Sequence, residues 1–133
     1  LEVGKWEVLK KGKRASILAV GSMVNIATTG YNQIRNEIGY SPTLINARFI
    51  KPIDTEMLDE ILSKNDIIVT MEEGSKIGGF GSFVLNYANS VNYSGKIHIL
   101  GIDDKFIDQG PRKDLLKSCG LSVESVIKSI LNE

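Results

Sequence analysis

The chain has 133 residues, of which 42% are hydrophobic, so it fits one globular domain with a core of its own. Its 16 basic and 16 acidic residues balance, which argues against nucleic-acid binding because that needs a basic face. One cysteine, Cys119, excludes an internal disulfide, and no apolar run reaches the roughly 18 residues of a membrane span. We therefore expect a cytoplasmic domain that binds neither nucleic acid nor a membrane.

Short apolar runs alternate with helical patterns along the chain, as in proteins built from βα units. The predicted strands of a parallel sheet lie at 15–20, 43–47, 66–71 and 96–100. Several of these runs are almost continuously apolar, which is typical of strands covered on both faces. Before them, residues 6–9 and the turn at 11–13 predict an antiparallel strand that forms a hairpin with the strand at 15–20. The expected fold class is α/β: a three-layer α/β/α sandwich with a five-stranded mixed, mostly parallel sheet.

The first three predicted helices have recognisable boundaries. Ser22 is a candidate N-cap of the first helix, and Gly39 is its candidate C-terminal stop. Asp54 can cap the second helix through its side chain. The third helix is expected to begin near 81–82, directly after a glycine-rich segment.

The C-terminal part of the chain predicts two further helices. A short one opens at Gly110–Pro111, where proline is tolerated in the first turn, and it ends near Cys119. We interpret Cys119 as a small buried residue rather than a nucleophile. Ser122 is the expected cap of a separate last helix, whose apolar stripe continues to residue 131.

Polar residues follow the predicted strands at the edge of the sheet where open α/β proteins bind their ligands. They are Ser22, Arg48, Glu72, Glu73, Asp103 and Asp104. One interpretation is an anion site, in which the helix amides after Ser22 and the Arg48 guanidinium converge on a phosphate or carboxylate. The alternative pairs Arg48 with Glu72 or Glu73, and we favour it because a mixed rim of charges usually satisfies itself.

Gly78, Gly79 and Gly81 lead into the third predicted helix and superficially resemble a phosphate-binding loop. The segment matches neither GxGxxG nor GxxxxGK[ST], however. We interpret these glycines as serving backbone geometry and close packing, with anion binding as the alternative. The sole histidine, His98, lies inside a predicted strand between isoleucines, as a packed or edge residue would. We therefore assign no catalytic residue, cofactor ligand or metal ligand to this chain.

Several segments together resemble the C-terminal domain of the thiamine-diphosphate enzymes of the transketolase superfamily. The pattern Arg48-x-x-Lys51-Pro52-x-Asp54 is shared across that superfamily. Within it, the segments most similar to the 1-deoxy-D-xylulose-5-phosphate synthase family are 3–9, 21–23, 72–82, 101–107 and 120–122. Two positions depart from that family, because Asp103 stands where proline is usual and Gln109 where histidine is usual. No role of that histidine can be carried over.

The resemblance implies that residues 1–133 are a single domain and a fragment of a longer enzyme. Such an enzyme condenses pyruvate with glyceraldehyde 3-phosphate for isoprenoid precursor biosynthesis. Its thiamine diphosphate and Mg²⁺ are held by other domains, and this chain lacks the diphosphate-binding signature. The implied partners are the missing N-terminal and pyrimidine-binding domains and the second subunit of a homodimer. The isolated chain is then an inactive structural and assembly domain.

Two alternatives remain open. One is the corresponding domain of a transketolase or of a 2-oxoacid dehydrogenase β subunit. The other is a free-standing small anion-binding α/β domain that uses the rim of residues at the strand ends. The sequence upstream of Leu1 would separate them, since a pyrimidine-binding domain there would establish the parentage.

Overall fold

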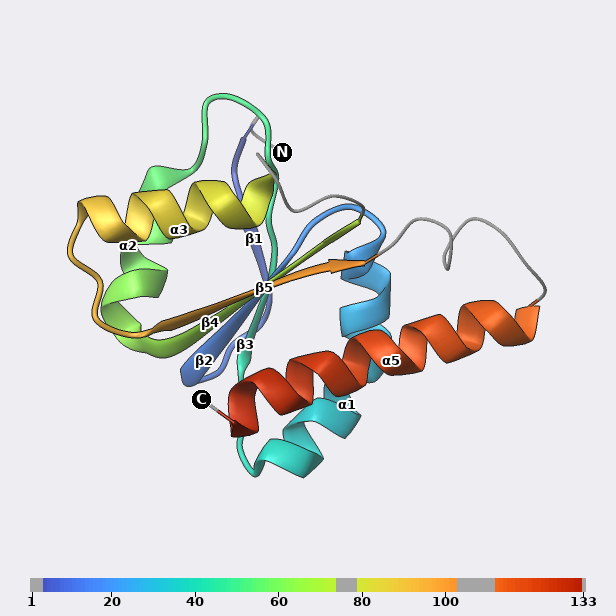
Figure 1. Cartoon of the computed structure of the whole chain (residues 1–133). Coiled ribbons are helices and arrows are strands. Elements are labelled where there is room, and N and C mark those ends of the chain that lie inside the picture. Colours follow the sequence, from blue (N-terminus) through green and yellow to red (C-terminus); the bar gives the residue numbers. More distant parts are fainter. Residues whose placement is uncertain (1–3, 74–78, 103–111, 133) are drawn as a thin grey trace.

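The computed structural model describes residues 4–73, 79–102 and 112–132. Strands and helices alternate along the chain, with the helices distributed over both faces of one sheet (Figure 1). In chain order the elements are β1 (Glu7–Lys10), β2 (Arg14–Ala19), α1 (Met23–Ile38), β3 (Thr43–Asn46), α2 (Thr55–Lys64), β4 (Asn65–Glu73), α3 (Phe80–Ser90), β5 (Lys96–Ile102) and α5 (Arg112–Leu131).

The sheet has five strands in the order β1-β3-β2-β4-β5. The strands β3, β2, β4 and β5 run parallel to one another, and β1 is antiparallel to β3. This arrangement confirms the predicted mixed, mostly parallel sheet. The four strands expected from the apolar runs all form, since a strand buried on both faces has a continuous apolar signal that is local in the sequence.

The predicted hairpin between β1 and β2 is wrong. β1 pairs instead with β3, with Val8 opposite Ile45, because β2 already has parallel partners on both sides, β3 and β4. The connection from β1 to β2 therefore crosses the start of β3. There the Lys13 amide donates to the Ser41 carbonyl at 2.9 Å, and a Cβ on Gly12 would collide with that same carbonyl.

Side chains alternate between two apolar layers on opposite faces of the sheet. Ile17 of β2 and Val69 of β4 lie in the cluster beneath α1 and α5, whereas Leu18 of β2 and Ile68 of β4 lie beneath α2 and α3. All four side chains are fully buried. Figure 1 shows the two helix pairs on either side of the sheet, which confirms the three-layer α/β/α sandwich.

The predicted helix ends are partly confirmed. Asp54 caps α2, because its Oδ1 accepts a hydrogen bond from the Met57 amide at 3.1 Å, and Gly39 ends α1 in the left-handed region at φ +89°. Ser22 occupies the position before α1, but its side chain makes no capping hydrogen bond. Its hydroxyl donates to Glu73 instead.

The two helices predicted near the C-terminus are one helix, α5, which runs without a break through Gly120 and Ser122. Ser122 is therefore not an N-cap; it is buried inside the helix. Packing outweighs the cost of about 1 kcal/mol for a glycine inside a helix, since Val123 packs so closely on α1 that a Cβ on Gly30 would collide with it. The expected start at Gly110–Pro111 lies outside the described residues.

Within the described ranges, none of the helices combines the length and apolar character needed to cross a bilayer.

Candidate functional site

The predicted rim residues gather at the carboxyl ends of β2, β3 and β4, as the parallel topology requires. Ser22 follows β2, Arg48 follows β3, and Glu72 and Glu73 end β4. Gly79 and Gly81 stand at the start of α3, next to Glu72. The predicted Gly78, Asp103 and Asp104 lie outside the described residues.

Glu72, near the end of β4, is buried at this rim. Its carboxylate accepts two backbone hydrogen bonds from the start of α3, one from the Phe80 amide at 2.9 Å and one from the Gly81 amide at 3.0 Å. Its exposed fraction is 8%. The first amides of a helix have no partner inside the helix and carry its positive dipole end. Glu72 therefore fills the position at α3 that an external anion would otherwise take.

Gly79 and Gly81 allow side chains of the sheet to lie close to the backbone of α3, and this is not a matter of unusual backbone angles. Gly79 has φ −90°, which other residues also adopt. A Cβ on Gly79 would lie 2.8 Å from Glu72 Oε2, and a Cβ on Gly81 would collide with Ile99 and lie 2.9 Å from Thr70 Oγ1. The geometry supports the close-packing interpretation of the two glycines.

Ser22 and Glu73 connect the start of α1 to the end of β4. The Ser22 hydroxyl donates to Glu73 Oε1, so a second carboxylate of this chain lies beside a helix N-terminus. A negative charge is favourable there. Two of the helices at the rim thus begin next to a glutamate of the chain itself.

The favoured pairing of Arg48 with Glu72 or Glu73 is wrong for the residues that the structure describes, where the ion pair formed is Lys64 with Glu60. Arg48 Nε is buried and has no hydrogen-bond partner in that part of the chain. The backbone carbonyl of Arg48, by contrast, accepts a hydrogen bond from Trp6 Nε1 at 3.0 Å. At Arg48 it is therefore the backbone carbonyl, and not the guanidinium, that has a hydrogen-bond partner among the described residues.

A row of aromatic rings lies beside the rim and was not anticipated from the sequence. Phe80 contacts Trp6 with ring centroids 5.6 Å apart and Phe49 with centroids 5.5 Å apart. Phe49 also contacts Phe83, which stacks on Tyr87. Only the spacing of Phe80, Phe83 and Tyr87 on α3 is visible as a local pattern, because the other two rings come from distant segments.

The described residues do not fit thiamine diphosphate with Mg²⁺. They contain no group of three His, Cys, Asp or Glu side chains that could hold a metal ion, and Glu72 is engaged by two amides of α3. His98 lies in β5 as predicted, and its Nε2 is buried without a hydrogen-bond partner among the described residues. No catalytic step can be derived from these groups.

Comparisons with known proteins establish the family. The model of the family described as "Transketolase, C-terminal domain" matches residues 4–126. The chain belongs to the transketolase C-terminal domain family. Curated relatives include 1-deoxy-D-xylulose-5-phosphate synthase of Thermotoga maritima, 40% identical over 95% of this chain and 19% of the relative. The same enzyme of Clostridium tetani is 41% identical over 96% of this chain and 21% of the relative. This chain thus spans about a fifth of the length of these relatives.

Solved structures agree with this transketolase C-terminal assignment. A chain described as a split gene transketolase, in an inactive β4 tetramer, matches with a TM-score of 0.75 and 30% identity. That match covers 97% of this chain and 44% of the other. A transketolase from Campylobacter jejuni matches with a TM-score of 0.58 and 19% identity over 98% of this chain and 19% of the other, which supports the fold alone.

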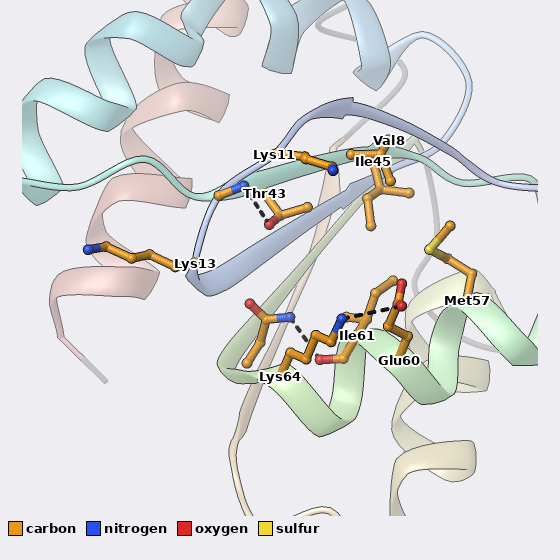
Figure 2. Close-up of a pocket in the computed structure, with 11 residues that line it drawn as sticks. Val8, Lys11, Lys13, Thr43, Ile45, Met57, Glu60, Ile61 and Lys64 are labelled. Atoms are coloured by element: carbon orange, nitrogen blue, oxygen red, sulfur yellow. Dashed lines mark hydrogen bonds and ion pairs between the residues drawn. The ribbon is translucent and has the colours of Figure 1, made fainter.

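This transketolase C-terminal domain also has a groove at the opposite, amino end of the sheet, between β1 and α2 (Figure 2). Its volume is about 390 Å³, and its apolar lining includes Val8, Ile45, Met57 and Ile61. Figure 2 shows Glu60 and Lys64 joined as an ion pair on α2 and Lys13 pointing away from them. The turn at 11–13 is exposed and borders this groove.

Proposed function

We propose that this chain is the C-terminal domain of a 1-deoxy-D-xylulose-5-phosphate synthase. The parent enzyme would condense pyruvate with glyceraldehyde 3-phosphate, releasing carbon dioxide and forming 1-deoxy-D-xylulose 5-phosphate. The observation that carries the proposal is the 40% identity to curated synthases over 95% of this chain. The solved transketolase chain is less similar, at 30% identity, so the synthase is preferred to a generic transketolase half.

The role of this domain in the parent enzyme would be structural. Thiamine diphosphate, which supplies the carbanion chemistry of such enzymes, would be held with Mg²⁺ by other domains. In support, the carboxylate of Glu72 at the rim is hydrogen-bonded to α3, and that of Glu73 is hydrogen-bonded to Ser22. Groups engaged in this way position the surrounding backbone and are poorly placed to act on a substrate.

The same contacts count against a free-standing anion-binding domain. A phosphate approaching the start of α3 would have to displace Glu72, whose carboxylate is already buried and doubly hydrogen-bonded there. At the start of α1 it would meet the charge of Glu73. The negative charges of phosphate and glutamate repel each other, and displacing Glu72 would also break its buried hydrogen bonds. Both effects make phosphate binding at this rim unfavourable.

Two measurements test the proposal. The complete polypeptide that contains this chain should form 1-deoxy-D-xylulose 5-phosphate from pyruvate and glyceraldehyde 3-phosphate when thiamine diphosphate and Mg²⁺ are supplied. The isolated chain should show no saturable heat when titrated with the cofactor and Mg²⁺. A complete polypeptide that uses only ketose donors would favour a transketolase, and micromolar cofactor binding by the isolated chain would contradict the structural role.

A further inference from the structure

The groove between β1 and α2 has the size and the apolar walls of a small-molecule site. Its volume is about 390 Å³, and ligand pockets generally measure about 300–1,000 Å³, with apolar walls and few polar groups. Val8 of β1 lies opposite Ile45 of β3 on one wall, and Met57 and Ile61 line the other wall from α2 (Figure 2). An apolar molecule in this groove would therefore contact both the sheet and α2, and it would remove from water the surface of Val8, which is 39% exposed.

Positive charge predominates in the lining of this groove, where three lysines stand against one glutamate. Lys64 is paired with that glutamate, Glu60, at 3.3 Å. Figure 2 shows Lys13 pointing away from the hollow and Lys11 pointing toward its apolar wall on the sheet. Lys11 has no ion-pair partner among the residues that the structure describes. Its ammonium group is therefore the charge that a ligand in the groove would meet.

The other cations around the same turn are engaged with aromatic rings. Lys10 Nζ lies 5.7 Å from the centroid of the Tyr31 ring, and the Arg14 guanidinium lies 4.8 Å from that of Tyr40. Contacts of this kind hold a cation by the negative face of the ring. Two of the neighbouring charges are thus directed to rings, and Lys11 is left for the groove.

The polar groups of the lining favour an anion on the side of the turn. Thr43 Oγ1 accepts a hydrogen bond from the Gly12 amide at 3.1 Å, so the hydroxyl can donate its own proton to a ligand. On the opposite wall α2 ends at Lys64, and the C-terminal end of a helix carries partial negative charge. An anionic group is therefore expected beside Lys11 and Thr43, with the apolar part of the ligand directed toward α2.

The free edge of β1 is poorly suited to an extended peptide. β1 is the last strand on its side of the sheet, but it has only four residues, and its register with β3 shifts between Val8 and Lys10. Short and irregular edge strands resist pairing with a further strand. A small molecule is therefore favoured over a peptide strand as the occupant of the groove.

We propose that the groove between β1 and α2 binds a small molecule with an apolar body and one anionic group, a carboxylate or a phosphate. The apolar body contacts Val8, Ile45 and Met57, and the anionic group pairs with the Lys11 ammonium. This binding goes beyond the proposed synthase function and does not depend on it, because the rim residues Ser22, Arg48, Glu72 and Glu73 do not line the groove.

Photoaffinity labelling of the complete polypeptide that contains this chain tests the proposal. The probes share one octyl chain that carries a diazirine, and they end in a carboxylate, a phosphate or an uncharged hydroxyl. We expect at least one anionic probe to label the peptides that contain residues 8–13 or 57–64 saturably, and the alcohol to label them more weakly. The anionic probe that labels at the lower concentration identifies the preferred head group. Absence of labelling on these peptides, or equal labelling by the alcohol, would overturn the proposal.

Two lysine variants of the same polypeptide separate a site from general attraction by charge. Lys11→Ala should weaken the affinity of the anionic probe about fivefold, the effect of losing one partly solvated ion pair. Lys13→Ala removes the same charge from the same turn and should leave the affinity unchanged, because Lys13 points away from the hollow. Equal affinity losses in the two variants, or no loss in either, would overturn the proposal.

A third variant tests the apolar part of the groove. Val8→Trp places a large side chain in the hollow and should abolish the saturable labelling, while the partial exposure of Val8 leaves room for the ring without a loss of melting temperature. Labelling at the wild-type level in a Val8→Trp protein would overturn the proposal. If this variant melts early, the comparison of Lys11→Ala with Lys13→Ala decides.

Discussion

The carboxyl and amino ends of the sheet hold their charged groups in different ways. At the carboxyl end, Glu72 is 8% exposed and accepts two hydrogen bonds from α3. At the amino end, Lys64 and Glu60 form an ion pair whose side chains are 68% and 56% exposed. A buried carboxylate bound to a helix start contributes more to stability than a solvated pair does. At the carboxyl end the buried glutamate thus holds the start of α3, whereas the exposed pair at the amino end borders the groove of about 390 Å³.

The largest expected effect is at Gly81, where the start of α3 packs closely on the sheet. Gly81→Val should lower the free energy of unfolding by about 3 kcal/mol, because its side chain has to enter space occupied by Ile99 and Thr70. Asn86→Val places the same side chain at an exposed position of α3 and should cost less than about 1 kcal/mol. Urea unfolding of both variants gives the comparison. Equal losses would mean that helix propensity, not packing, explains Gly81.

Glu72→Ala should have the next largest effect. It leaves the Phe80 and Gly81 amides without their acceptor in a buried position, and we expect a loss of about 2 kcal/mol in the free energy of unfolding. Glu60→Ala, at the amino end, removes only the exposed pair with Lys64 and should cost about 0.3–0.5 kcal/mol. A similar loss of stability in the two variants would mean that the buried glutamate at the carboxyl end stabilises the domain no more than the exposed pair at the amino end.

A smaller effect should appear with pH at the amino end. Burial, and then the charge of Asp66, raise the pKa of Tyr93 to about 12, and its hydroxyl donates to the Asn65 carbonyl at 2.9 Å. Because the folded pKa is above the unfolded value near 10, the stabilisation is complete below about pH 10 and is lost as the pH rises toward 12.

The measurement for Tyr93 compares the wild type with Tyr93→Phe between pH 9 and 12 in steps of about half a pH unit. The wild type should lose up to about 1 kcal/mol more than the variant over this range, a value reduced because the side chain is partly in solvent. Ultraviolet titration of the tyrosines should show one late transition that the variant lacks. If the two proteins show the same dependence of stability on pH and the same ultraviolet titration, the Tyr93 hydroxyl is exposed to solvent.

The sequence predicted features whose signal is local and missed those decided by distant contacts. The parallel strands were correct because each is an apolar run in itself, and the position of the rim followed from their common direction. The predicted partner of β1 was wrong because a strand can pair only with a strand that has a free edge. Both edges of β2 are already paired, one with β3 and the other with β4. The break expected before Ser122 was wrong because the packing of Val123 on Gly30 spans more than ninety residues of sequence.

For the candidate site, too, the sequence predicted what depends on local signals and missed what depends on distant contacts. The sequence placed Glu72, Glu73, Ser22 and Arg48 at one edge, and the described residues confirm that placement. It could not predict which partner each side chain takes. Glu72 bonds to amides eight and nine residues later, beyond the reach of local capping rules, whose partners lie within three residues. The favoured Arg48 pairing failed for the same reason, since a position at an edge does not determine the direction of a side chain.

The smallest expected effect is that of phosphate on the carboxyl end. Phosphate should leave the melting temperature of the wild type unchanged relative to chloride at equal ionic strength, because Glu72 occupies the start of α3. A half-saturated phosphate site would instead stabilise the domain by RT ln 2, about 0.4 kcal/mol. Gly79→Val should melt at a lower temperature in both salts, since its Cβ would lie 2.8 Å from Glu72 Oε2. An anion-binding loop gives the opposite pattern: phosphate protects the wild type, and Gly79→Val loses that protection while keeping its melting temperature in chloride.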